Sequence, residues 1–421
     1  MYRTLLFSIF LISFYGVFSQ DKLPSKEIKV GLVLSGGGAK GFAHIGALKV
    51  IEEAGVKIDY IGGTSMGAII GALYAAGYSA NELDSIFKNT DFTKLIQDNL
   101  PRNAKTFYEK EDSERYALAL PFDKFKISFP SAISSGQSIY NELVRLLYHV
   151  REVTDFNQLP IPFFCIATNV ETGDEVVLNK GYLPEAIMAS GTFPSLFEPS
   201  EIDGKILIDG GVINNYPVDR VMKMGANVII GVDVQHGLSN RETLSSATEI
   251  LLQINNYRTV KDMIKKSENT DIYIKPNIEK YSVIDFGLLN EIVDKGEIAA
   301  RENYIALKEL AIKQNKNLLP RTPIKIKDTL IIEDLIINGI ENYSRGYVKG
   351  KLRLPVDNVV SFEKLQQGIS NLSATGNFKT IRYQLLSNHD NTDLVLKLKE
   401  NPNKTFIKMG VHYDDLLNSA A

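Results

Sequence analysis

Hydrophobic positions in the first two thirds of the chain follow two alternating patterns. Short runs of consecutive apolar residues, typical of strands buried on both faces, alternate with longer segments whose apolar residues recur at helical spacing. The strand-like runs are IKVGLVLS, DYIGG, PFFCIATNV, GKILIDGG and NVIIGVDV, and GFAHIGALKVIEEAG is a helical segment. The alternation predicts an α/β fold class, with a central, mostly parallel sheet covered on both faces, over residues 27–319.

The pattern changes after Pro320. TLIIEDLIINGI is typical of a strand, SRGYVKGKLRL and SFEKLQQGISNLSAT of short helices, and TIRYQLL with TDLVLKLKE of a hairpin. The predicted order of strand, helix, helix, strand, strand (βααββ) defines a small α+β domain over residues 324–401. Apolar residues then alternate in FIKMGVHY, as in a strand of a membrane barrel. We expect residues 405–421 to begin a truncated outer-membrane β-barrel, the alternative being a frayed tail.

The N-terminus carries the apolar run LLFSIFLISFYGV shortly after Arg3. This run is shorter than the ~20 residues of a membrane-spanning helix. Val17, Phe18 and Ser19, which are small or of moderate size, precede Gln20 as before a cleavage site. We therefore predict that residues 1–19 are a secretory signal peptide.

Composition narrows the classes of partner and cofactor. The chain has 421 residues, 44% hydrophobic and 23% charged, which is typical of a globular protein with two or three domains. A net charge of -3 gives no basic excess, so nucleic acid is not an expected partner. The single cysteine, Cys165, excludes an internal disulfide and a multi-cysteine metal site.

Residues 63–67 form a G-x-S-x-G motif between a predicted strand and a predicted helix. This is the context of a nucleophile elbow, in which the serine hydroxyl is exposed on a sharp turn at a helix N-terminus. Gly63 and Gly67 would relieve crowding around Ser65 in such a turn. The alternative is that Ser65 only caps the helix.

The glycine-rich turn SGGGAKG fits two kinds of anion. Gly36, Gly38 and Gly41 match the G-x-G-x-x-G string of a dinucleotide site, but that site needs an acidic residue at the end of the second strand. Here the second strand ends in the elbow, and Asp59 lies at its beginning. Because adjacent parallel strands end at the same edge of a sheet, the turn is expected beside Ser65, where its N–H groups can stabilise an oxyanion.

A serine nucleophile also needs a base. A triad in the order serine, acid, histidine would use His236. The stronger candidate is Asp209, which ends an apolar strand and precedes Gly210 and Gly211, although D-G-G is also a common turn sequence.

The motifs GGGAKG, GTSMG and DGG, with SGTFPSLFEP before the last, together resemble the patatin-like phospholipase family over about residues 29–234. The match is to its bacterial, barrel-fused type. The resemblance implies a lipid acyl hydrolase in which Ser65 is the nucleophile and Asp209 the base of a dyad. It further implies an acyl-enzyme intermediate and no metal or cofactor. The oxyanion hole would consist of the N–H groups of Gly36, Gly37 and Gly38, with support from Lys40, Gly41, Gly63, Gly67, Gly210 and Gly211.

Further residues near these motifs have expected roles. An aspartate near its reference pKa of ~3.9 is a poor base for an alcohol, so burial should raise the pKa of Asp209. Lys40 either biases the oxyanion site or is solvated at a helix start, and His44 is expected to be structural. The turn after the base would be shaped by Asn214, Asn215 and Pro217. Apolar stripes more often belong to the core than to a lid or lipid-facing wall, and both are possible for Phe87, Phe92, Leu95, Ile96, Leu100 and Phe107.

The order of elements in residues 324–401 is similar to a POTRA domain, the periplasmic module of Omp85-type outer-membrane proteins. This implies a bacterial cell envelope location, in the outer membrane, with the side that the enzyme faces left open. Expected partners are a phospholipid or other lipid ester, a membrane surface, an outer-membrane barrel in the full-length chain, and a second copy in a homodimer. Two alternatives remain: an esterase for soluble esters with a Ser65, Asp209, His236 triad, and a non-catalytic outer-membrane assembly or interaction module.

Overall fold

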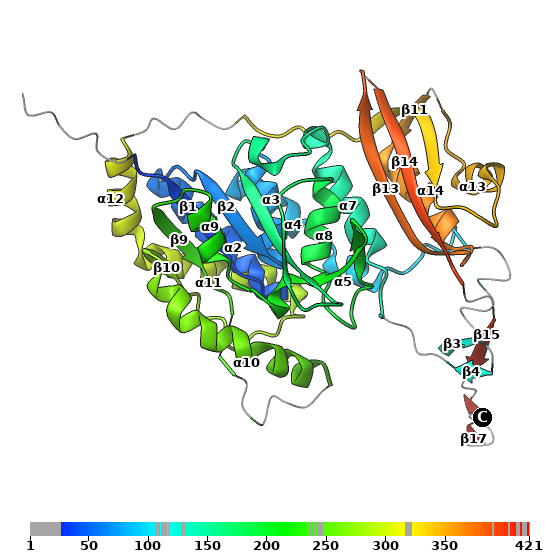
Figure 1. Ribbon diagram of the computed structural model, residues 1–421, viewed down its shortest axis with the longest axis horizontal. Coiled ribbons are helices and arrows are strands. Elements are labelled where there is room, and N and C mark those ends of the chain that lie inside the picture. Colours follow the sequence, from blue (N-terminus) through cyan, green and yellow to red (C-terminus); the bar gives the residue numbers. More distant parts are fainter. Residues whose placement is uncertain are drawn as a thin grey trace, which may run out of the picture.

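The computed structural model forms a large α/β domain, a smaller four-stranded sheet with its helices, and short strands near the C-terminus (Figure 1). The predicted signal peptide, residues 1–19, lies outside the described residues. The structure describes residues 27–421 except 106–109, 111–115, 117, 124, 128–131, 236, 239–240, 242–246, 316–321, 357, 390, 403–404, 410–412, 415–418 and 421.

The central sheet contains eight strands among the described residues, in the order β10-β9-β1-β2-β5-β8-β7, with β6 paired to β5. The five strands from β10 to β5 are parallel, whereas β6, β7 and β8 pair antiparallel with their neighbours. This confirms the predicted α/β fold class. The strands are β1 (Val30–Leu34), β2 (Tyr60–Thr64), β5 (Phe163–Asn169), β6 (Glu175–Leu178), β7 (Ser200–Ile202), β8 (Lys205–Asp209), β9 (Val228–Val232) and β10 (Ile272–Ile274).

The strand β1 explains why the apolar runs are continuous. Leu32 and Leu34 pack into one hydrophobic core, and Val33 packs into a second core with Phe164 and Val221. Successive side chains of a strand point to opposite faces, so a sheet covered on both sides needs apolar residues at every position.

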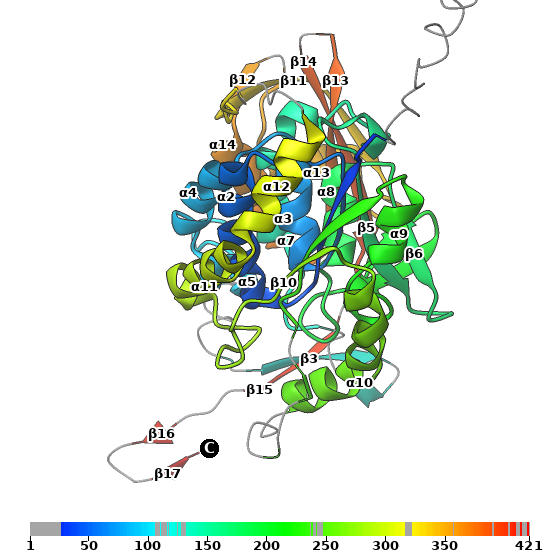
Figure 2. The ribbon, with the colours of Figure 1, turned by 90° about the vertical axis from the view of Figure 1, so that its left-hand side faces the viewer.

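Helices cover both faces of the sheet (Figure 2). Helices α9 and α10 lie on one side, and α2, α3, α4, α11 and α12 lie on the other. No helix in the described part of the chain has the length and hydrophobicity to cross a bilayer. The helices of this domain are α2 (Ala43–Ala54), α3 (Met66–Ala75), α4 (Ala80–Lys88), α5 (Phe92–Gln97), α7 (Gln137–Leu146), α8 (Leu183–Ser190), α9 (Val218–Lys223), α10 (Ala247–Glu268), α11 (Leu289–Glu302) and α12 (Tyr304–Gln314).

The smaller sheet has the order β12-β11-β14-β13, in which β11 and β14 are parallel. The strand β12 adds to the βααββ order expected from the sequence. The sheet packs against the α/β domain beside α7 (Figure 1), where the Tyr140 hydroxyl donates to the Tyr383 carbonyl oxygen at 2.6 Å. Its elements are β11 (Thr329–Asn338), α13 (Arg345–Leu352), β12 (Asn358–Ser361), α14 (Phe362–Ser373), β13 (Phe378–Asn388) and β14 (Asn391–Glu400).

The segment predicted to begin a barrel contains the strand β15 (Phe406–Met409). It pairs antiparallel with β3 (Leu118–Asp123), which also pairs with β4 (Lys126–Ile127). Two shorter strands follow, β16 (Tyr413–Asp414) and β17 (Ser419–Ala420). That residues 405–421 begin a membrane barrel stays a prediction.

Candidate active site

Ser65 lies on the turn between β2 and α3. Its backbone has φ 55° and ψ -123°, a region that residues other than glycine rarely adopt. The Ser65 side chain makes no capping hydrogen bond to α3, and its Oγ instead donates to Asp209 Oδ2 at 2.6 Å. The alternative that Ser65 serves only as a helix cap is therefore wrong.

Glycines allow the strand and helix to approach each other around this turn. A Cβ atom on Gly63 would lie 2.5 Å from the Gly67 carbonyl oxygen, and one on Gly67 would lie 2.3 Å from the Leu34 carbonyl oxygen. A Cβ atom on Gly41 would lie 2.3 Å from Met66 Cγ. The first turn of α3 thus packs directly against the end of β1, which positions Ser65 beside the glycine-rich turn.

Asp209 is the last residue of β8, and only 4% of its surface is exposed. Burial raises the pKa of its carboxyl group from 3.8 to about 6, although hydrogen bonds from the Ser65 hydroxyl and the Gly211 N–H oppose the shift. The Gly211 N–H donates to Asp209 Oδ1 at 2.7 Å, which orients Oδ2 toward Ser65. Gly210 passes so close to β5 that a Cβ atom would lie 2.2 Å from the Ile166 carbonyl oxygen.

The glycine-rich turn lines the same cavity as Ser65 and Asp209. The Gly36 N–H donates to the side chain of Asn215 at 3.1 Å, whereas the N–H groups of Gly37 and Gly38 have no hydrogen-bond acceptor among the described residues. Gly38 has φ 55°, and a Cβ atom there would lie 2.3 Å from the Val283 carbonyl oxygen, so this position requires glycine.

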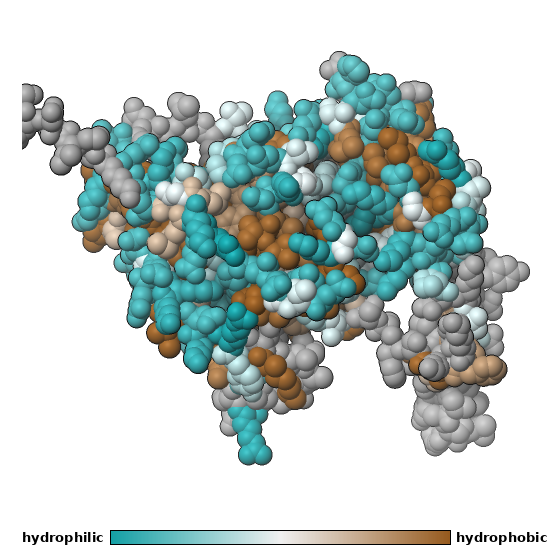
Figure 3. All heavy atoms as spheres, viewed as in Figure 1, coloured by the Kyte–Doolittle hydropathy of each residue, from teal (hydrophilic) through white to brown (hydrophobic). Residues whose placement is uncertain are grey.

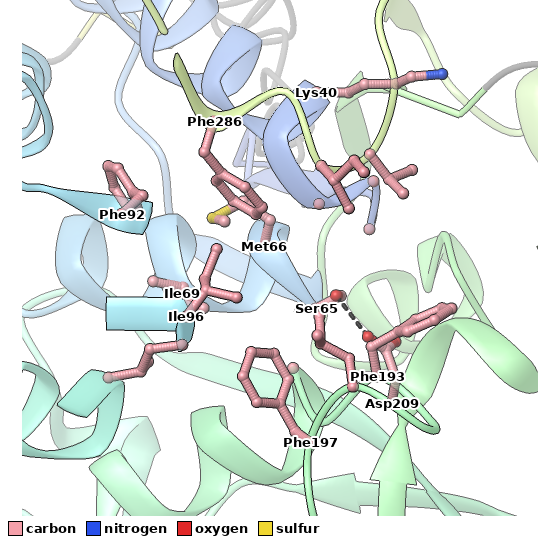
Figure 4. Close-up of a pocket in the computed structure, with 18 of the residues that line it drawn as sticks. Lys40, Ser65, Met66, Ile69, Phe92, Ile96, Phe193, Phe197, Asp209 and Phe286 are labelled. Carbon is pink, nitrogen blue, oxygen red and sulfur yellow. Dashed lines mark hydrogen bonds between the residues drawn. The ribbon is translucent and has the colours of Figure 1, made fainter. Parts of the chain in front are cut away.

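Lys40 is buried, with 2% of its surface exposed, and is not solvated. Its pKa is lowered to about 8, mainly by burial and then by repulsion from Lys275. In Figure 4 its side chain points away from Ser65. A direct contact between Lys40 and the reacting atoms is therefore not part of this arrangement.

The histidines in the described residues have partners away from the dyad. His44 is fully buried, its Nε2 lies 2.8 Å from the Ser35 carbonyl oxygen, and burial lowers its pKa to about 4. This fits the structural role expected for it. His236 lies outside the described residues, so the triad alternative stays untested.

A cavity of about 460 Å³ extends from Ser65 between the helices (Figure 4). Ser65, directly before α3, lines it together with Ile69 and Leu73 on one face of α3, so this wall extends for ~12 Å at 1.5 Å per helical residue. Of the residues that the sequence suggested for a lid or wall, four line the cavity: Phe87, Phe92, Leu95 and Ile96. Leu100 does not line it, and Phe107 lies outside the described residues. Its wall is largely apolar.

Several lining residues were missed by sequence reasoning. Phe193 and Phe197 belong to the loop after α8, Phe286 follows β10, and Ile139 and Leu143 lie on α7. The aromatic residues of SGTFPSLFEP, next to the DGG motif, were the available signal for the first two. The sequence offered no comparable signal for Phe286, because only tertiary packing brings it to the cavity.

A serine hydrogen-bonded to a buried aspartate, at the carboxyl edge of a three-layer α/β domain, defines the class of serine hydrolases. Residues 32–222 match the family described as patatin-like phospholipase. This part of the chain is therefore similar to patatin-like phospholipase domains, and proteins of that family are serine hydrolases acting on carboxylic esters. Residues 392–421 match the OMP85 superfamily.

Curated relatives and a solved structure are similar to part of this chain. Lysophospholipase nte1 of Emericella nidulans is 28% identical over 66% of this chain and 18% of its own length. Patatin-like phospholipase domain-containing protein 6 of Mus musculus is 29% identical over 63% of this chain and 20% of its own length. This chain thus spans about a fifth of these relatives. The crystal structure of VipD from Legionella pneumophila covers 66% of this chain and 67% of its own chain, with a TM-score of 0.39 and 15% identity.

Proposed function

We propose that this chain is a lipid acyl hydrolase of the phospholipase A type, which cleaves ester-linked fatty acids. The observation that carries the proposal is the 2.6 Å hydrogen bond from Ser65 Oγ to Asp209 Oδ2 at the wall of a largely apolar cavity. The buried carboxylate of Asp209 is placed to accept the proton of the Ser65 hydroxyl, and the cavity offers a site for a fatty acyl chain.

In the proposed reaction, Asp209 takes the proton of Ser65 while Oγ attacks the ester carbonyl carbon. N–H groups of the glycine-rich turn stabilise the negative charge on the carbonyl oxygen. The ester C–O bond then breaks, Asp209 returns the proton to the leaving oxygen, and the acyl group stays on Ser65. Water attacks this acyl-enzyme with Asp209 again as base, which releases the fatty acid and restores the Ser65 hydroxyl.

The proton affinity of Asp209 suits this role. A general base is most effective when its pKa lies near the operating pH, and an ordinary aspartate is too acidic. Burial brings the pKa of Asp209 to about 6, so the carboxylate is ionised at neutral pH but accepts a proton more readily than an exposed one.

The cavity supports an acyl chain as the part of the substrate that is recognised. Its wall along α3 starts at the nucleophile and continues through Ile69 to Leu73. Burial of each methylene contributes roughly 0.8 kcal/mol, so a long chain placed along this wall would gain substantial affinity. The relatives named as lysophospholipases are consistent with a substrate that carries a fatty acyl ester.

We also propose a cell envelope location at the outer membrane, with a POTRA-like domain at residues 324–401. The support is the match of residues 392–421 to the OMP85 superfamily, together with the signal peptide predicted at residues 1–19. The membrane barrel that would follow, the lipid surface as partner and the homodimer all belong to this proposal.

The test is hydrolysis of phospholipid vesicles and of a short-chain nitrophenyl ester by the purified chain. Ser65→Ala and Asp209→Asn should lower turnover about 10³-fold or more while the protein stays folded. Ser79→Ala is a matched control, because Ser79 caps α4 outside the cavity and should keep normal turnover.

Each other outcome points to a different function. Cleavage of only the short ester would indicate a soluble-ester esterase, and loss of turnover in His236→Ala would indicate a triad. A folded chain that cleaves neither substrate, and whose Ser65 does not react with a fluorophosphonate, would indicate a non-catalytic envelope module.

A further inference from the structure

The side chain of Asn215 holds both polar groups of one glycine of the glycine-rich turn. The Gly36 N–H donates to Asn215 Oδ1 at 3.1 Å and to the Asn215 backbone carbonyl oxygen at 3.3 Å, and Asn215 Nδ2 donates to the Gly36 carbonyl oxygen at 3.2 Å. A backbone N–H can only donate and a carbonyl oxygen can only accept, so the two side-chain bonds fix the orientation of the amide. Asn215 therefore clamps the backbone of Gly36.

The same side chain contacts both halves of the active site. A Cβ atom on Gly36 would lie 2.3 Å from Asn215 Oδ1 and 2.9 Å from Ser65 Cβ. A Cβ atom on Gly211 would lie 2.9 Å from the same Asn215 oxygen, and Gly211 donates to the carboxylate of Asp209. Asn215 Oδ1 thus lies between the turn beside Ser65 and the turn that orients Asp209.

A chain of hydrogen bonds anchors Asn215 to a buried anion. Asn215 Nδ2 also donates to Gln235 Oε1 at 3.0 Å, and Gln235 Nε2 donates to Asp233 Oδ1 at 3.0 Å. Asp233 is 2% exposed, and its Oδ2 accepts from Tyr273 Oη at 2.5 Å and from Lys275 Nζ at 2.8 Å. A carboxylate can only accept hydrogen bonds, so the Asp233 carboxylate determines which atom donates and which accepts in each hydrogen bond from Asp233 to Gly36.

We propose that Asn215 is a positioning residue that fixes Gly36 so that the N–H groups of Gly37 and Gly38 form the oxyanion hole. The inference rests on the proposed function. An oxyanion hole needs donors that are aimed at the developing charge and are not already used. The Gly36 N–H is bonded to Asn215, whereas those of Gly37 and Gly38 have no acceptor in the described part of the chain. Gly36 therefore contributes the anchor of the turn.

The kinetic test compares Asn215→Ala and Asn215→Asp with Asn214→Ala as the matched control. The Asn214 side chain contacts Glu175 and Lys266 and makes no hydrogen bond to the glycine-rich turn. Turnover of a short-chain nitrophenyl ester is measured per site titrated with a fluorophosphonate, so misfolded protein does not count. We expect kcat to fall about 10²-fold in both Asn215 variants, as for loss of an oxyanion donor, with KM changed less than about threefold.

Asn215→Asp separates positioning from packing. Aspartate has the shape of asparagine and still accepts from the Gly36 N–H, but it cannot donate to the Gly36 carbonyl oxygen or to Gln235. If Asn215 acted only through packing, this variant would keep the wild-type kcat per titrated site. That result would overturn the proposal.

Amide hydrogen exchange tests the clamp without relying on activity. In Asn215→Ala, exchange in a peptide containing Gly36 should be several-fold faster than in wild type or Asn214→Ala, because both side-chain hydrogen bonds to Gly36 are lost and its N–H keeps only the bond to the backbone carbonyl oxygen of residue 215. Unchanged exchange would contradict the clamp. A wild-type protein that neither labels nor hydrolyses would refute the proposed function, and the exchange rate would then decide the clamp alone.

Discussion

Replacing Asp209 by asparagine should stabilise the protein at neutral pH while it removes turnover. The folded-state pKa of Asp209 is about 6, above the ordinary value of 3.8, because burial penalises the charged carboxylate. Between these values the folded protein binds more protons than the unfolded chain, so this group lowers stability as pH rises through about 4 to 6. At 1.36 kcal/mol per pKa unit, the loss reaches roughly 3 kcal/mol at pH 7, and asparagine avoids it.

Thermal unfolding at two pH values measures this effect. At pH 7.5 the Tm of Asp209→Asn should exceed that of wild type by several degrees, and near pH 4 the difference should be small. Asp84→Asn is a control of opposite sign: burial tends to raise the pKa of Asp84, but hydrogen bonds from Lys49 and Lys88 lower it overall. That variant should lose stability at neutral pH. A lower Tm for Asp209→Asn at pH 7.5, or a difference independent of pH, would refute the reasoning.

The same pKa sets the acid limb of the activity profile. For a soluble short-chain ester, kcat/KM reports the ionisation of the free enzyme. With a pKa of about 6, roughly a tenth of Asp209 is ionised at pH 5, and kcat/KM should fall to about a tenth of its plateau. An ordinary aspartate would be more than nine tenths ionised at that pH. Full activity at pH 5 would therefore exclude Asp209 as a base with a raised pKa.

Three further substitutions, one of them with a control, test packing at the site and against the smaller sheet. Gly67→Ala places a Cβ atom 2.3 Å from a carbonyl oxygen of β1, so it should lower stability by about 1–3 kcal/mol in thermal unfolding and abolish labelling of Ser65 by a fluorophosphonate. The control Gly287→Ala has open space around the new Cβ atom and should change neither stability nor labelling. Ile69→Trp should lower kcat/KM for a long-chain ester roughly tenfold or more relative to a four-carbon ester, because it fills the cavity next to the nucleophile; equal losses would contradict an acyl site there. Tyr140→Phe removes the hydrogen bond to Tyr383 and should cost about 1 kcal/mol of stability in urea unfolding, with kcat unchanged.

The elements that carry Ser65 could be predicted because their signals are local. A continuous apolar run, a glycine-flanked serine and a helical repeat occur in this order within residues 28–76, and together they predict a strand, a nucleophile elbow and a helix. It could also be predicted that the glycine-rich turn lies beside Ser65, because the parallel strands β1 and β2 end at the same edge of the sheet. Local pattern and strand direction were sufficient for this part of the site.

Contacts between distant segments could not be predicted from such patterns. Asn215 and Gly36 are 179 positions apart, and nothing in NNYPV indicates which of its two asparagines turns toward the glycines. Phe286 reaches the cavity from a loop after β10, and Lys40 is buried although lysines at helix starts are usually solvated. In each case the outcome depends on how loops pack at the sheet edge.

The apolar surroundings of the site link substrate binding to base strength. Burial is the largest contribution to the raised pKa of Asp209, and Asp209 lines the same cavity as the apolar side chains that we assign to the acyl chain. A cavity that excludes water from a hydrocarbon chain also removes water from the carboxylate, so one wall serves both purposes. The Ser65 hydroxyl and the Gly211 N–H limit this effect by stabilising the ionised form. In the proposed mechanism, Asp209 is thereby basic enough to accept the proton of Ser65 and is still ionised at neutral pH, so the proposed dyad needs no histidine.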